Sequence, residues 1–143
     1  MSVKQISVFL ENKAGTLGDM TQVLAENDID MKAFSLAEAS DFGIARMIVD
    51  DTYKTTQVLK SSGFISSVST VLAVSVPDVP GGLNSVLSAL KELNINVEYM
   101  YALLGGEKNA AYMIMKVSDE AKAAAKLTSK NMRLVDQEEL SSL

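Results

Sequence analysis

The chain has 143 residues with a formal net charge of −5, and 48% of its residues are hydrophobic and 22% charged. This composition is typical of a globular protein with one ordinary domain or two small ones. The acidic balance argues against nucleic-acid and anionic-membrane partners, because clustered lysine and arginine hold both. The absence of cysteine and histidine removes thiolate chemistry, the commonest general base and the commonest zinc ligand, so we expect no catalysis, no metal site and no cofactor.

The hydropathy of the chain predicts a cytoplasmic protein. Its apolar runs are shorter than the ~18 residues of a membrane span, and Met1–Leu10 lacks the basic segment and apolar core of a secretory signal. A chain without cysteine also suits a reducing compartment.

The first half of the chain predicts the element order strand, helix, strand, strand, helix, strand. A period of two in the apolar residues indicates a strand, and a period between three and four indicates a helix. These patterns give a strand marked by Ile6, Val8 and Leu10, a helix with Leu17, Met20, Val23 and Leu24 on one face, a strand marked by Ile29, Met31 and Ala33, a hairpin turn at Asp41-Phe42-Gly43, a strand near Ile44–Val49, a helix near Thr52–Ser62 and a short strand near Ile65–Ser69.

The second half predicts the same order. Ser118 precedes its second helix and is the expected N-cap. The elements are a strand marked by Leu72, Val74 and Val76, a helix with Leu83, Val86, Leu90 and Leu93 on one face, a strand marked by Ile95, Val97, Tyr99, Tyr101 and Leu103, a hairpin turn at Gly105-Gly106-Glu107, a strand near Ala110–Val117, a helix near Asp119–Ser129 and a short strand near Met132–Val135.

The two halves are related as an internal repeat with an offset of 66 residues. At this offset Gly15–Met31 falls on Gly81–Val97 without a gap. Identical residues lie at Gly15/Gly81, Leu17/Leu83, Leu24/Leu90, Glu26/Glu92 and Ile29/Ile95. The order β-α-β-β-α-β is that of the ferredoxin-like arrangement. We therefore predict an α+β fold of two ferredoxin-like modules, residues 1–69 and 70–143, each an antiparallel sheet with its helices on one face.

Apolar side chains are predicted on both faces of each sheet. Alternation places Phe34 and Leu36 opposite Met31, and Met100 and Met115 add apolar surface in the second copy. One interpretation is a few exposed apolar side chains, which are common. Because large exposed apolar patches are rare on monomers, the sequence favours a homodimer in which a second copy covers this face.

Two loops, Leu10–Leu17 and Val76–Leu83, join the first strand of each copy to its first helix. Glycine lets the backbone approach a ligand closely. The free N–H groups of the helix start favour an anion such as a carboxylate. A polar side chain stands three residues before the glycine in each loop, as Asn12 or Asp78. Taken singly, either loop can equally be an ordinary turn.

The segment ISVFLENKAGTLGDMTQVLAENDIDMKAFSL, Ile6–Leu36, resembles the opening of an ACT domain. VPDVPGGLNSVLSALKELNINVEYM, Val76–Met100, resembles a second one and has the family's usual proline at Pro80. ACT domains are regulatory modules that commonly pair side by side and bind amino acids at the junction. The resemblance therefore implies an allosteric regulatory protein that binds an amino acid effector, has no catalytic activity, and holds its ligand at an interface between ACT modules.

The resemblance also implies which residues bind the ligand. In serine-sensing members, an asparagine in the first loop and another just inside the second strand hold the effector from opposite domains. Asn12 and Asp78 fall at the loop position, and Asp30 and Asn96 at the strand position. The same loops contribute Ala14, which replaces the usual proline, together with Gly15, Thr16, Leu17, Pro80, Gly81, Gly82 and Leu83.

The residue types predict that the two implied sites differ. If the copies pair through their second strands, Asn12 meets Asn96 and Asp78 meets Asp30. The amide pair donates and accepts hydrogen bonds, which suits a zwitterion. The doubly acidic pair repels a carboxylate and favours a cation. We therefore expect the Asn12/Asn96 site to be the better amino-acid site.

Two other functions share parts of this pattern. An RNA-recognition module has the same element order but needs spaced aromatic residues on its first and third strands, which Gly43–Val49 lacks. The first copy also resembles the N-terminal module of acetolactate synthase regulatory subunits, which dock on a catalytic chain. The alternative function is therefore that of a regulatory subunit for a separate metabolic enzyme.

Overall fold

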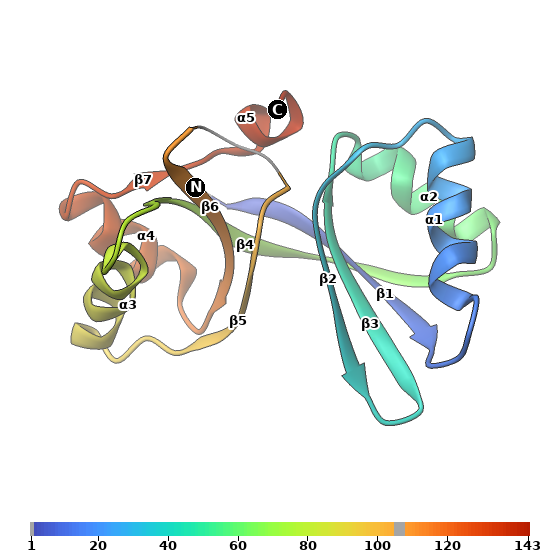
Figure 1. The fold of residues 1–143 in the computed structure, drawn as a ribbon, viewed down its shortest axis with the longest axis horizontal. Coiled ribbons are helices and arrows are strands. Elements are labelled where there is room, and N and C mark those ends of the chain that lie inside the picture. The colour runs from blue at the N-terminus through green and yellow to red at the C-terminus, as the bar shows by residue number, and fades with distance from the viewer. Residues whose placement is uncertain (1, 105–107) are drawn as a thin grey trace. The chain divides into compact units, whose positions relative to one another are not determined.

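The computed structural model describes residues 2–104 and 108–143, and the chain divides into two compact units (Figure 1). We call Lys4–Ser69 module 1, and Thr70–Leu143 with the residues before Lys4 module 2. The hairpin turn predicted at Gly105-Gly106-Glu107 lies outside the described residues.

Module 1 has the predicted order β-α-β-β-α-β. Its strands follow the order β2-β3-β1-β4, and β3 is antiparallel to both of its neighbours. Its elements are β1 Val3–Glu11, α1 Thr16–Glu26, β2 Met31–Ala39, β3 Phe42–Val49, α2 Thr52–Ser61 and the first residues of β4 Ile65–Pro77.

Module 2 repeats this order and adds a short helix at its end. Its strands follow the order β5-β6-β4-β7, with antiparallel pairing throughout. After β4 its elements are α3 Gly82–Glu92, β5 Val97–Ala102, β6 Ala110–Val117, α4 Glu120–Ser129, β7 Arg133–Leu134 and α5 Gln137–Ser141. The α+β fold of two ferredoxin-like βαββαβ modules predicted from the sequence is thus confirmed.

The core of each module lies between its sheet and its two long helices, which cover one sheet face (Figure 1). Strand residues two apart supply one side of this core and helix residues three or four apart supply the other. In module 1 the core includes Ile6, Val8, Leu10, Met47, Met20, Leu24 and Leu59. In module 2 it includes Leu72, Val74, Val76, Met115, Val86, Leu90 and Leu127.

Three of the residues predicted on a second apolar face point to these cores instead. A register shift in β2 lies between Met31 and Ala33, and it puts Phe34 against the core of module 1. A matching shift in β5 puts Met100 against the core of module 2, and Met115 is a buried member of that core. The predicted face was wrong for Phe34 and Met100 because a β-bulge reverses the alternation that follows it. Met115 lies on β6, whose register with β4 is continuous, and it belongs to the core with its partner Leu72. Leu36 is 51% exposed.

Other local predictions also need correction. Helix α4 is capped by Asp119, whose side chain accepts from Lys122 N at 3.0 Å. Ser118, the predicted cap, instead accepts from Asn96 N at 3.0 Å. Strand β7 has two residues, and the unpredicted helix α5 begins with Asp136 as its N-cap. A helix this short has too few turns to show a helical period in its apolar residues, so the sequence pattern does not predict it.

Strand β3 begins at Phe42, a residue predicted from the sequence to lie in the preceding hairpin turn. It therefore does carry an aromatic residue, next to Phe9 of β1, with 6.4 Å between the ring centroids. Each of the two rings is 43% exposed.

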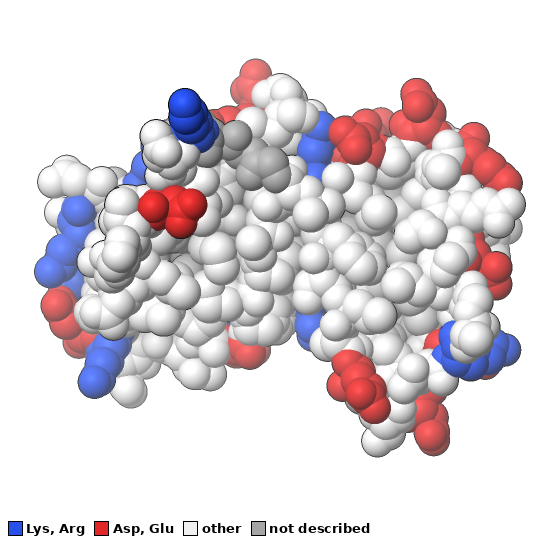
Figure 2. Space-filling view, in the orientation of Figure 1, with Lys and Arg blue, Asp and Glu red and all other residues white. Residues whose placement is uncertain are grey.

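Charged side chains of both signs are distributed over the surface. Figure 2 shows Lys and Arg interspersed with Asp and Glu on the face in view, and the described residues there form no continuous basic surface. Along residues 2–104 and 108–143, none of the helices is long and apolar enough to span a bilayer.

Candidate functional site

The two loops singled out in the sequence have the same backbone geometry. Gly15 and Gly81 have φ of 89° and 83° and stand at the N-caps of α1 and α3. This left-handed conformation favours glycine, because a Cβ atom crowds the backbone there. Neither helix has a side-chain cap.

The other three helices begin differently. Asp51, Asp119 and Asp136 cap α2, α4 and α5, and each carboxylate accepts a backbone N–H of the first turn. The N–H donors of a helix start need such a partner. Helices α1 and α3 therefore have the open N-termini, and this is where an anionic group is best received.

In each module a backbone hydrogen bond ties the loop to the start of the third strand. Asn12 N donates to Asp41 O at 3.0 Å, and Asp78 N donates to Asn109 O at 3.0 Å. The Asn12 side chain adds a bond from Nδ2 to Ser40 O at 3.3 Å. The amide of Asn12 is therefore oriented by the β2–β3 turn, with its Oδ1 as the remaining acceptor.

A cavity of about 250 Å³ lies beside the loop of module 1. Two of the predicted residues, Asn12 and Leu17, line it. The rest of its wall comes from the loop and from the β2–β3 hairpin, namely Leu10, Glu11, Lys13, Leu36, Ala37, Glu38 and Gly43. Hydrogen-bonding groups, charges of both signs and apolar side chains thus meet in one small volume.

Two of the charged residues of this cavity, Glu11 and Lys13, form an ion pair. Lys13 Nζ and Glu11 Oε2 are 2.9 Å apart. The hydrogen bond from Lys13 to Glu11 and the charge of that carboxylate raise the pKa of Lys13 above its ordinary value. Lys13 is therefore a cation throughout the physiological range.

The remaining predicted residues of this loop lie around the helix start. Ala14 and Gly15 are exposed. The Thr16 hydroxyl is buried and has no hydrogen-bond partner among the described residues. Its N–H donates to Lys13 O over 3.5 Å. An unsatisfied buried hydroxyl is uncommon, because it has lost its hydration without a replacement.

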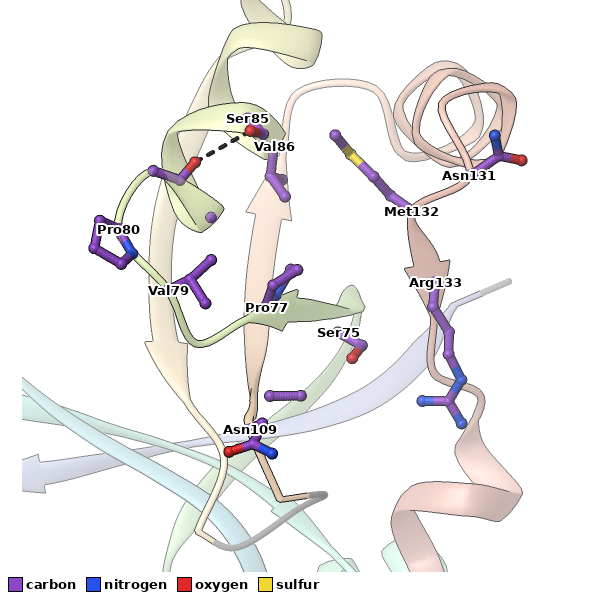
Figure 3. Close-up of a pocket in the computed structure, with 13 residues that line it drawn as sticks. Ser75, Pro77, Val79, Pro80, Ser85, Val86, Asn109, Asn131, Met132 and Arg133 are labelled. Carbon is purple, nitrogen blue, oxygen red and sulfur yellow. Dashed lines mark hydrogen bonds between the residues drawn. The ribbon is translucent and has the colours of Figure 1, made fainter.

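A larger cavity, of about 480 Å³, lies beside the loop of module 2 (Figure 3). Pro80, Gly81 and Gly82 of the predicted set line it, together with Pro77, Val79 and Val86. Asp78 and Leu83 are exposed residues of the same loop. A Cβ atom on Gly82 would overlap the carbonyl oxygen of Pro77, so only glycine fits this close approach of helix and loop.

The strand positions Asp30 and Asn96 immediately precede β2 and β5 rather than lying inside them. The Asp30 carboxylate pairs with Lys32 Nζ at 2.8 Å, and its N–H donates to Asp50 Oδ1 at 3.2 Å. The registry puts Ala39 opposite Phe42 and Met31 opposite Val49, so Asp30 is at the far end of the sheet from Asn12, about 25 Å along the strand. Asn96 and Asp78 are separated in the same way, because Val97 pairs with Val117 and Pro77 with Ala110. A module does not bring its own loop and strand positions together.

Sequence reasoning missed several lining residues. Glu38 and Leu36 reach the first cavity because β2 ends beside the loop. Asn109 reaches the second because β6 begins opposite Pro77 of β4, and Asn131, Met132 and Arg133 reach it because the chain returns after α4 to pair with β4. Only the turn at Gly43 carried a local signal, since the other contacts depend on strand registry.

Arg133 stands on the wall of the second cavity and also holds helix α5. Its guanidinium pairs with Glu139, and Nη1 donates to the Tyr112 hydroxyl at 3.2 Å. The guanidinium carbon is 5.9 Å from the Tyr112 ring centroid. The hydrogen bond to Glu139, followed by that to Tyr112, raises the pKa of Arg133 further above its ordinary value. Within the described ranges no group of three or more acidic residues is placed to hold a metal ion.

Known proteins share both the sequence pattern and the fold of this chain. The family model described as an ACT domain pair matches residues 1–143. Among curated proteins no significant match was found. Protein BT0572 from Bacteroides thetaiotaomicron is a similar solved structure, with 38% identity, a TM-score of 0.93, and coverage of 100% of this chain and 98% of that one.

Two solved structures with lower identity share the fold. The regulatory subunit of aspartate kinase from Thermus thermophilus, in its ligand-free form, has 16% identity and a TM-score of 0.67, with 90% of each chain covered. The corresponding subunit from Thermus flavus has 15% identity and a TM-score of 0.64, with the same coverage.

Proposed function

Because the chain belongs to the family of ACT domain pairs, we propose that it is a regulatory protein that binds a free amino acid and has no catalytic activity of its own. The observation that carries this proposal is the cavity of module 1, where Asn12, Lys13 and Glu38 surround an apolar wall. We place the protein in the cytoplasm, as its composition suggests.

The chemistry of an amino acid matches this cavity group by group. Lys13 and the open N-terminus of α1 attract a carboxylate. Glu11 and Glu38 attract an ammonium group, and the Oδ1 of Asn12 accepts one of its protons. Leu17 and Leu36 provide apolar contact for a side chain.

In this proposal the ligand lies at a junction between ACT modules. Asn12 of one module and Asn96 of another both bind the ligand. This arrangement fits the separation of the two positions within a single module. Asp78 with Asp30 would form the poorer site, since two carboxylates repel the carboxylate of the ligand.

A thermal-shift screen over the standard amino acids, followed by calorimetry with the best ligand, tests the proposal. Asn12→Ala is expected to weaken binding by about ten- to a hundred-fold, or roughly 1–3 kcal/mol, because a hydrogen bond to the ligand is lost. Asp78→Ala, at the equivalent loop position, is the matched control and should change the affinity much less.

Two results would contradict this assignment. If Asp78→Ala abolishes binding while Asn12→Ala leaves it unchanged, the site is in the other loop. If none of the amino acids stabilises the protein, the amino-acid ligand is wrong.

A second candidate function is that of a regulatory subunit which docks on a separate metabolic enzyme. Its support is the fold shared with the Thermus proteins named regulatory subunits of aspartate kinase. The test is whether the protein co-elutes with a purified metabolic enzyme and whether the amino-acid ligand changes that enzyme's rate. A free-standing sensor would bind the amino acid equally well and alter no such rate.

A further inference from the structure

We propose that the cavity of module 2 is a second ligand site, built for a small aliphatic monocarboxylate rather than for an amino acid. The two modules would then have specialised after duplication to recognise different molecules. This inference does not depend on the function proposed for module 1.

Both cavities contact the start of the third strand, at Gly43 in module 1 and at Asn109 in module 2, but they extend from the loop in different directions. In module 1 the cavity extends from the loop toward the β2–β3 hairpin, where Leu36 and Glu38 form its wall. In module 2 it extends toward β7, where Met132 and Arg133 form its wall. The second cavity is therefore not a copy of the first.

The shortness of β7 explains why this space exists. Asn131 has φ of 60°, and Met132 N donates back to Leu127 O at 3.0 Å, so the chain turns from α4 into β7 only at Arg133. Arg133 pairs with Ser75, and no residue of β7 reaches Pro77. Pro77 has no N–H that would require a partner strand. The place of a longer edge strand is left as a cavity of about 480 Å³, within the range of small-molecule sites.

The apolar side chains of this cavity lie mainly toward one end. Figure 3 shows Val86 and Met132 at that end, near the polar Ser85 and Asn131, and Ser75, Asn109 and the Arg133 side chain toward the other end. The Ser85 hydroxyl donates to Gly81 O at 3.1 Å. Val79 and Pro77 lie between the two ends. A ligand with an apolar body and one polar head fits this distribution.

The charge of the cavity wall determines which polar head group the ligand can have. Arg133 is the charged residue of this wall among the described residues. Its contacts with Glu139 and Tyr112 fix the guanidinium in place, and a fixed guanidinium binds a carboxylate with directional hydrogen bonds. An ammonium group on the same ligand would be held near this like charge, which is unfavourable. The cavity of module 1 differs because Glu11 and Glu38 line its wall, whereas Glu139, which pairs with Arg133, does not line the cavity of module 2.

Three molecules with one carbon skeleton test the proposal on the full chain: 4-methylpentanoate, 4-methyl-2-oxopentanoate and leucine. Binding is followed by NMR through the methyl group of Met132, which lines this cavity and does not line the cavity of module 1. Both acids are expected to shift the Met132 signal at millimolar concentration, and leucine should bind here at least about ten-fold more weakly. The difference between the two acids shows whether a 2-oxo group is recognised by Ser75 and Asn109.

A pair of isosteric variants tests the role of charge. Asn109→Asp adds a carboxylate to the polar end of the cavity and should weaken binding of both acids by about ten-fold. Asn94→Asp is the matched control, because Asn94 is also an exposed residue with positive φ, at 55° against 67° for Asn109. It adds the same charge to module 2 away from this cavity and should leave the affinity unchanged.

A variant that fills the cavity gives an independent check. Val79 is 60% exposed, so Val79→Trp adds volume from the loop without disturbing the core, and it should abolish the Met132 shift. Asn12→Ala should not affect it, which separates this site from that of module 1. The proposal is overturned if leucine shifts Met132 as strongly as the acids do, if the two aspartate variants weaken binding equally, or if neither acid shifts Met132.

Discussion

Gly18, near the start of α1, and Gly82, at the start of α3, differ in the space available for a side chain. Gly82 is buried, and a Cβ there would overlap the Pro77 carbonyl, whereas a Cβ on Gly18 would meet open space. Gly82→Ala is expected to lower the free energy of unfolding by about 1–3 kcal/mol, because backbone must move. Gly18→Ala should raise it by up to about 1 kcal/mol through helix propensity. Urea titrations of both variants measure the contrast, and equal effects would show that the contact with Pro77 is relieved at little cost.

The unsatisfied hydroxyl of Thr16 should lower the stability of the ligand-free protein. Thr16→Val removes the hydroxyl at constant shape and should stabilise the ligand-free protein by about 1 kcal/mol, since a desolvated polar atom is lost. Thr21→Val is the control, because the Thr21 hydroxyl donates to Gly18 O at 3.1 Å. If Thr16→Val destabilises the protein as much as Thr21→Val does, the hydroxyl has a partner in solution.

The sequence predicted the turns better than it predicted the sheet face to which each strand residue points. Gly15 and Gly81 were recognisable as the turns that open α1 and α3, and both have the positive φ that favours glycine. The faces of Phe34 and Met100 were not recognisable. A bulge is set by pairing with the neighbouring strand, and it leaves no mark in the local alternation.

At the scale of elements, Glu92 joins α3 to α4. Its carboxylate is 2.7 Å from Lys126 Nζ and 3.6 Å from Lys130 Nζ. The hydrogen bond and charge of Lys126, with the charge of Lys130, lower the pKa of Glu92 from its ordinary 4.5. A carboxyl with a lowered folded pKa adds stability above pH 4.5, and this contribution is lost as the pH falls below that value through the folded pKa.

Glu92→Gln should therefore lower the melting temperature at neutral pH, and this effect should shrink as the pH falls from 4.5 through the folded pKa of Glu92, because the carboxyl group itself becomes neutral there. Glu26→Gln is the matched control, because Glu26 occupies the equivalent position in α1 and accepts from the neutral Gln22 at 2.9 Å. Thermal melts of both variants across this range decide the matter. A Glu92→Gln effect that is independent of pH would mean that the ion pairs add nothing beyond packing.

The long elements could be predicted from the sequence and the short ones could not. Core residues such as Val86 and Leu90 repeat at helical spacing over several turns, which is enough to define α3. Helix α5 has five residues, and its contacts depend on Glu139 meeting Arg133. The cavity wall beyond the loops was missed for the same reason, because Met132 and Arg133 join it through pairing between distant segments.

For the molecule as a whole we expect a homodimer. The exposed pair of Phe9 and Phe42 is the kind of apolar surface that a second copy covers. Light scattering at micromolar concentration should give twice the chain mass of 15.3 kDa. Phe9→Asp should shift the protein toward the monomer, whereas Tyr53→Asp, at an exposed aromatic residue of α2, should not. A native protein with the mass of one chain would refute the dimer.

The uncapped starts of α1 and α3 also give each module a measurable rate of amide hydrogen exchange that depends on its own ligand. Amide protons without a hydrogen-bond acceptor exchange quickly with deuterated water, so the first turns at Leu17 and Leu83 should exchange ahead of the aspartate-capped turn at Lys54. A ligand that accepts these protons slows the turn it occupies and leaves the other at its original rate. Exchange at two peptides thus reports separately which module is filled, without a label or a mutation, even while the ligand is still unidentified.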